Sequence, residues 1–185
     1  MNVESAQQGM RDAYVDGWPG VTISGIVWLI AAAVCLKVGT VAGIFTLFIG
    51  GMTIFPLSLV ASKALGRAGT HLKNNPMGPL ALETTALLFG GLAIAFGVSQ
   101  VNPNWFFPVM LITIGCRYLM FQTLYGLKLY WLLGVLLALP GVAFMFLPTQ
   151  PVWPALTGGV VETAIGAWLL RAALSEATYD APRHH

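Results

Sequence analysis

Residues 41–62 read VAGIFTLFIGGMTIFPLSLVAS, a run of 22 residues without Asp, Glu, Lys or Arg. A helix of about 20 mostly apolar residues is long enough to cross the hydrocarbon core of a bilayer. Five further stretches are also mostly apolar, and short breaks with polar residues, Pro or Gly divide them: 20–36, 81–99, 105–125, 127–147 and 152–172. The sequence therefore predicts an all-α integral membrane protein with six transmembrane helices.

The composition of the whole chain supports this fold class. Of its 185 residues, 57% are apolar and 9% are charged, whereas an ordinary soluble domain has roughly 25% charged residues. A soluble fold of this length has too little interior to hide so much apolar surface. The net charge of +2 is too small to indicate nucleic acid as a partner, so we expect the lipid bilayer to be the main partner.

The distribution of basic residues indicates how the helices are oriented. With six spans, the loops after the second, fourth and sixth helices lie on the same side as the amino-terminal segment. These loops hold most of the Lys and Arg residues, namely Lys63, Arg67, Lys73, Lys128, Arg171 and Arg183. Because basic loops stay in the cytoplasm, we expect a cytoplasmic segment 1–19, a transmembrane domain 20–174 and a cytoplasmic tail 175–185.

Motifs of catalytic and metal sites are missing from the sequence. It has no Gly-rich phosphate loop, no His-Glu-x-x-His and no serine elbow. Cys35 and Cys116 lie in different predicted helices and indicate no disulfide framework. His71 has no second His or Cys nearby, and His184 with His185 resembles the remnant of a tag. We therefore expect that the protein is not an enzyme and binds no cofactor or metal.

Glycine spacings indicate an internal threefold repeat. Pairs of glycines 25 residues apart occur at Gly25 and Gly50, Gly90 and Gly115, and Gly134 and Gly159. In each unit a basic residue follows a glycine of the second helix by 13 residues, at Lys63, Lys128 and Arg171. This pattern predicts three helical hairpins of like orientation, 20–65, 81–128 and 129–174, although 21 glycines also allow chance matches.

Mid-helix glycines let helix backbones approach closely, which favours packing inside a membrane. We therefore predict that the second helices of the three hairpins form a tight inner cluster. The glycines expected to mediate this packing are Gly50, Gly51, Gly115, Gly158, Gly159 and Gly166. Glycine-rich faces also suit self-association, so a homo-oligomer is a further possible partner arrangement.

The hairpin pattern Gly25-Ile-Val-Trp-Leu followed by Leu47-Phe-Ile-Gly-Gly-Met resembles the HdeD family of small bacterial acid-resistance membrane proteins. The stretches Trp105-Phe-Phe-Pro, Arg117-Tyr-Leu and Thr123-Leu-Tyr-Gly-Leu are similar to an uncharacterised family of bacterial six-helix proteins. Both resemblances imply a bacterial inner membrane. Neither implies catalytic residues.

Apart from Lys128 and Arg171 at the ends of spans, three charged residues lie inside predicted spans, at Glu83, Arg117 and Glu162. Such residues are costly in a membrane and are functional candidates by default. Arg117 and Glu162 are at similar depths along their helices, which allows them to meet. Three alternatives are open: a salt bridge that fixes helix order, a carboxylate that titrates or binds substrate in a polar cavity, or contacts to lipid headgroups or another subunit.

Tyr118, Gln122 and Tyr125 share one stripe of the fourth predicted helix. The stripe either lines a solute pocket or, through Tyr125, anchors the helix at the membrane interface. Together with Arg117 and Glu162 it suggests binding or transport of a small molecule or a proton. The alternatives are a non-transporting membrane scaffold or stress-response protein, and a substrate-capture subunit of a larger transporter.

Overall fold

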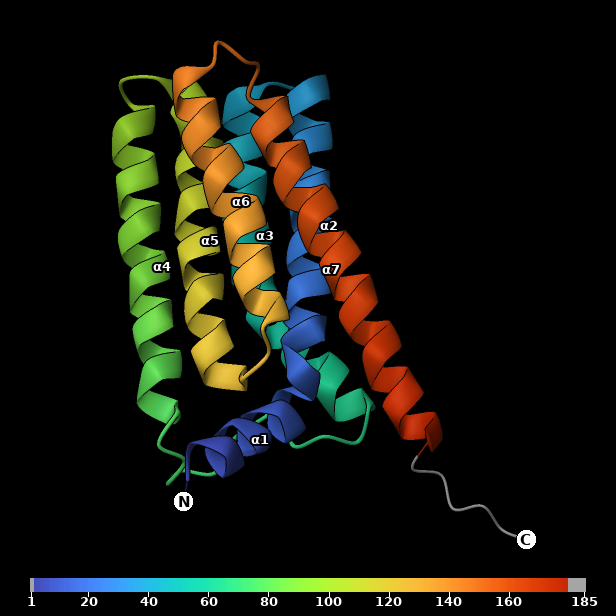
Figure 1. Ribbon diagram of the computed structural model, residues 1–185. Coiled ribbons are helices and arrows are strands. Elements are labelled where there is room, and N and C mark those ends of the chain that lie inside the picture. Colours follow the sequence, from blue (N-terminus) through green and yellow to red (C-terminus); the bar gives the residue numbers. More distant parts are fainter. Residues whose placement is uncertain (1, 180–185) are drawn as a thin grey trace, which may run out of the picture.

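The structure is a computed structural model that describes the backbone of residues 2–179 and the side chains of residues 2–171. All regular elements within these residues are helices. Six long helices run side by side as one bundle (Figure 1): α2 (Trp18–Lys37), α3 (Thr40–Ala64), α4 (Gly78–Ser99), α5 (Phe106–Tyr125), α6 (Leu129–Phe146) and α7 (Val152–Tyr179). Two 3-10 helices, η1 (Val15–Gly17) and η2 (Pro103–Trp105), precede α2 and α5.

The predicted helices agree closely with the observed ones. The largest difference at a helix start is at α4, predicted from 81 and observed from Gly78, while α7 runs beyond the predicted 172 to Tyr179. Within the described residues, the helices that contain α2, α3, α4, α5 and α6 are long and apolar enough to cross a membrane. Of the predicted tail, the part after Tyr179 lies outside the described residues, and His184, His185 and Arg183 lie there.

The centre of the bundle differs from the predicted inner cluster of α3, α5 and α7. Helix α2 packs against both α3 and α7, and α5 packs against both α4 and α6, whereas α3 has no such contact with α5 or α7. The reason is the position of small residues, because Gly25 of α2 faces α7 and the Ala31 backbone of α2 faces Gly43 of α3. The prediction was therefore wrong for α3, which lies at the outside of the bundle.

Close helix contacts occur at most of the glycines predicted to pack. A Cβ atom on Gly115 of α5 would lie 2.7 Å from the carbonyl oxygen of Gly134 in α6. Gly50, Gly158, Gly159 and Gly166 also face a neighbouring helix, each at a distance that leaves no room for a side chain. Gly51 differs, because nothing lies within 4 Å of its Cβ position, so its predicted packing role is not found in this chain.

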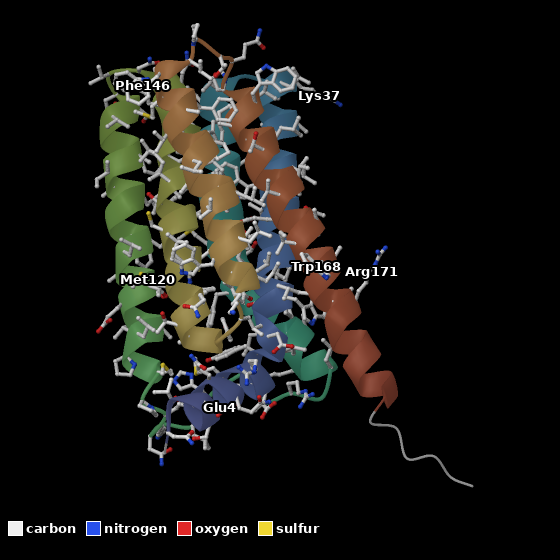
Figure 2. All side chains as sticks on the ribbon, viewed as in Figure 1. Glu4, Lys37, Met120, Phe146, Trp168 and Arg171 are labelled. Carbon is white, nitrogen blue, oxygen red and sulfur yellow. The ribbon has the colours of Figure 1, made fainter. Side chains whose placement is uncertain are left out.

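Helix α1 (Val3–Tyr14), which was not predicted from the sequence, lies across one end of the bundle, here called the α1 end (Figure 1). The Asn2 side chain begins α1 by accepting a hydrogen bond from Ser5 N at 2.8 Å. Ala6, Met10 and Ala13 form its buried face. Figure 2 shows Glu4 at this end and both Lys37 and Phe146 at the opposite end.

Hydrogen bonds between distant parts of the chain hold α1 in place. Gln7 Nε2 donates to Thr123 O at 2.8 Å, and the Arg11 guanidinium donates to Tyr125 O, so both satisfy carbonyls in the last turn of α5. The side chain of Asn75, in the loop between α3 and α4, donates to Ala6 O at 3.0 Å. We call the hydrogen bonds of Gln7, Arg11 and Asn75 the α1 latch.

Tyr14, the last residue of α1, contacts the same loop. Its hydroxyl lies 2.9 Å from His71 Nδ1. Partial burial raises the pKa of Tyr14 above its ordinary value, and the hydrogen bond with His71 offsets part of that rise. Tyr14 therefore keeps its proton throughout the neutral range.

Candidate functional site

Glu162 is the only acidic residue within residues 2–171 that is fully buried, with 0% of its surface exposed. It comes from the middle of α7, which packs along α2. Neither carboxyl oxygen has a hydrogen-bond partner among the described residues. Burying an ionised carboxylate costs several kcal/mol even after the protein relaxes, so an unpaired carboxyl here lowers stability and points to a function.

Two hydroxyl groups lie beside the Glu162 carboxyl. Ser24 of α2 and Tyr118 of α5 are both buried, and their hydroxyls lie near the carboxyl without the geometry of a hydrogen bond. Arg117 of α5 acts on it only through its charge. Helices α2 and α5, which are far apart in sequence, therefore bring donor groups toward the carboxyl of α7.

Arg117 does not form the salt bridge that the sequence allowed. No ion pair between Arg117 and Glu162 occurs within the described side chains, and Arg117 Nε is buried without a hydrogen-bond partner. The guanidinium carbon instead lies 5.0 Å from the ring centroid of Phe121, one turn further along α5. The site therefore combines an unpaired carboxyl with a guanidinium whose hydrogen-bonding capacity is partly free.

The position of Glu162 follows from a reciprocal contact between α2 and α7. Each helix carries a Thr-x-x-Gly sequence, Thr22-Ile-Ser-Gly and Thr163-Ala-Ile-Gly. A Cβ on Gly25 would lie 2.5 Å from Thr163 Oγ1, and one on Gly166 would lie 2.3 Å from Thr22 Oγ1. The two helices thus run antiparallel in a single register, and this register puts Glu162 beside Ser24.

Tyrosine rings extend from Glu162 toward the α1 end. Tyr118 stacks on Tyr130 of α6, with ring centroids 6.0 Å apart and an interplanar angle of 24°. Tyr125 stacks on Tyr130 in the same way at 5.3 Å. The Tyr130 hydroxyl donates to the carbonyl oxygen of Asp16 in η1 at 2.6 Å. Phenol groups therefore connect the buried carboxyl with the turn between α1 and α2.

The remaining predicted site residues lie apart from this group. Glu83 is exposed on the outside of α4. Gln122 is half-buried, and no hydrogen bond found among the described residues joins its side chain to the tyrosines. Glu162, Arg117, Tyr118 and Tyr125 are brought together, whereas Glu83 and Gln122 are not.

Sequence reasoning missed Ser24 and Tyr130. Ser24 lies among apolar residues of α2 and gave no signal without knowledge that α2 and α7 are neighbours. Tyr130 follows Lys128 and precedes Trp131, a pattern typical of a residue at the membrane interface. The structure instead buries Tyr130 to 1% exposure.

The chemistry available at this site is limited to proton exchange and hydrogen bonding. A carboxyl can gain or lose a proton, and hydroxyls of Ser24 and Tyr118 can donate to it or accept from it. The free donors of Arg117 suit an anionic or carbonyl-bearing group. The arrangement thus fits a proton, or a small polar solute with donor and acceptor groups.

Comparison with known proteins identifies the family but no relative of known activity. Neither the curated proteins nor the solved structures gave a match. The resemblance to the HdeD family gained no support from these comparisons, whereas the expected membership of an uncharacterised family is confirmed. A family model matches residues 3–172, so the chain belongs to the family of unknown function DUF7010.

Proposed function

We propose that this protein is an integral membrane protein that takes up and releases a proton at Glu162, coupled to the binding or transport of a small polar solute. The observation that carries the proposal is the fully buried carboxyl without a hydrogen-bond partner among the described residues. Ionisable groups in such surroundings are typical of proton relays and transport sites in membrane proteins.

Insertion in a membrane is supported by the outer surface of the bundle. Large apolar side chains are more than half exposed on several helices, among them Phe55 of α3, Phe89 of α4 and Leu139 of α6. Such a surface is unfavourable in water and favourable in lipid. The basic residues at the α1 end, Lys63 in the last turn of α3 and Lys128 just before α6, favour a cytoplasmic location for that end, in a bacterial inner membrane.

The alternative function, a non-transporting scaffold, predicts a different arrangement of Arg117 and Glu162. If Glu162 served only to fix helix order, its charge would be expected to close on Arg117 in a direct ion pair. A buried pair of this kind is retained because removal of one partner leaves the other charge unpaired. The separation of Arg117 from Glu162, with Arg117 over Phe121, favours a site that holds a proton or solute.

Infrared difference spectroscopy of the protein in lipid nanodiscs tests the proposal, because the C=O stretch of a neutral carboxyl disappears on ionisation. We expect a carboxyl band that appears and disappears reversibly as pH is cycled between acidic and alkaline values. Glu162→Gln should remove this band. Glu83→Gln is the matched control, because Glu83 is exposed, and should leave the band in place.

Two outcomes would overturn the proposal. One is the absence of any pH-dependent carboxyl band that Glu162→Gln removes. The other is an experimental structure in lipid in which Glu162 and Arg117 form a direct ion pair with all carboxyl oxygens hydrogen-bonded to the protein.

A further inference from the structure

We propose that the proton of Glu162 enters and leaves from the α1 end, through the hydroxyls of Tyr118 and Tyr130, with the turn at Asp16 as its outlet. This inference rests on the proposed function of Glu162 and adds a route and a side of access. A fully buried carboxyl needs such a route, because protons do not cross apolar protein without hydrogen-bonding groups.

The first step of the route joins Glu162 to Tyr118. The Tyr118 hydroxyl lies at short range from the carboxyl, and the ring is 5% exposed. Arg117 is the other charged group that faces the carboxyl, and Ser24 faces it from α2. Ser24 lies in a seam closed by Gly25 and Thr163, so Tyr118 is the group that leads out of the site.

The second step joins Tyr118 to Tyr130. The two rings stack nearly parallel, and Phe121 packs edge-on against both of them at 5.5 and 5.6 Å. This packing fixes the rings and shields them from lipid. The Tyr130 hydroxyl donates to Asp16 O and not to Tyr118, so we expect a water molecule to bridge the two hydroxyls, as water often does between polar groups.

The third step reaches the turn between α1 and α2. Tyr130 donates to Asp16 O at 2.6 Å, so its hydroxyl proton points to the α1 end. Val15 and Asp16 both have left-handed φ angles, 52° and 54°, and Gly17 follows at 77°. Left-handed conformations are costly for residues other than Gly and cluster at functional sites. Here they present the Asp16 carbonyl to Tyr130 instead of to a helix.

Release of a proton from Glu162 needs the Tyr130 O–H bond to point toward the α1 end, as it does here. The O–H bond of the Glu162 carboxyl breaks, and its proton passes through a bridging water molecule to the Tyr118 oxygen. Tyr118 passes its own proton through the bridging water to the Tyr130 oxygen, and Tyr130 passes its proton to a water molecule at the Asp16 turn. Each phenol is neutral before and after, and uptake follows the reverse order once the Tyr130 hydroxyl has rotated.

Time-resolved infrared spectroscopy after photolysis of a caged proton measures how fast Glu162 is protonated in nanodiscs. We expect Tyr118→Phe and Tyr130→Phe to slow the rise of the Glu162 band by about a hundredfold, the lower end of what loss of a proton-transfer group costs. The final amplitude should be unchanged. Tyr14→Phe is the matched control, because this phenol contacts His71 and is outside the route, and the rate should equal that of the unaltered protein.

Unchanged rates in both Tyr118→Phe and Tyr130→Phe would overturn the route while leaving the proposed function intact. A slower rise in Thr22→Val, with unchanged rates in both tyrosine variants, would move the route to the α2–α7 seam and also contradict it. Tyr118→Phe keeps the test valid if Tyr130→Phe fails to fold, because Tyr118 does not hold the Asp16 turn. Loss of the band itself from the unaltered protein would instead mean that the proposed function has failed.

Discussion

The α1 latch and the Glu162 site use polar side chains in opposite ways. In the latch, Gln7, Arg11 and Asn75 donate to backbone carbonyls of α5 or α1. At the Glu162 site, both carboxyl oxygens and Arg117 Nε are buried without such partners within the described residues. Paired polar groups stabilise a fold, whereas unpaired buried groups lower stability and are kept for a reason other than stability. The latch therefore holds the end of the bundle, and the unpaired group is the place to look for activity.

The largest loss of stability should come from a side chain added at the close contact between α2 and α7, which positions the Glu162 site. Gly25→Ala should destabilise the protein by about 3 kcal/mol, the upper end of the usual cost of overpacking, because its Cβ would meet the backbone nitrogen of Thr163 at 2.6 Å. Gly51→Ala, whose Cβ meets nothing within 4 Å, should be neutral or stabilising by up to about 1 kcal/mol. Thermal unfolding in the same detergent compares the two. Equal destabilisation by both would contradict the proposed packing of α2 on α7.

A smaller loss should follow from opening the latch. Asn75→Ala removes a buried donor to Ala6 O and an acceptor for Met77 N, and should cost about 2 kcal/mol for two hydrogen bonds. Hydrogen exchange of α1 amides should rise with it, while exchange in α7 should not. Unaltered protection of α1 would show that Asn75 does not hold this helix. Asn74→Ala, at an exposed neighbouring position, is the matched control.

The smallest effect should appear only at high pH. Because burial raises the pKa of Tyr14 in the folded state, its contribution is fully present below the ordinary tyrosine pKa of about 10 and is lost as pH rises through the folded value. The stability difference between the unaltered protein and Tyr14→Phe should therefore be constant near neutral pH and should shrink in strongly alkaline solution. A constant difference across that range would contradict the burial of the Tyr14 hydroxyl in the folded protein.

The helices were predictable from sequence for a physical reason. A span such as 41–62 must be apolar along its whole length, and this requirement is local. Helix α1 was also within reach, because Ala6, Met10 and Ala13 follow helical spacing after an Asn that can begin a helix. This pattern is weaker than the pattern of the long apolar runs that follow it.

The site was predictable only in part. Arg117 and Glu162 were identified from the sequence because an ionisable group in a span is costly. Their similar depth predicted that they lie near each other, which agrees with the structure. Their separation depends on Phe121, which attracts the guanidinium, and on the α2–α7 register, which puts Ser24 beside the carboxyl. These are relations between helices that a single sequence does not encode in any local pattern.

The most direct test of the account is the stability of the Arg117→Met and Glu162→Leu variants, alone and combined. Because the two charges are not paired, each single variant should cost less than about 1 kcal/mol of unfolding free energy, and their effects should add within about 0.5 kcal/mol. A buried ion pair would behave differently: either single variant would cost about 3–5 kcal/mol, and the double variant would recover most of it. The first result supports an unpaired Glu162, and the second would contradict it.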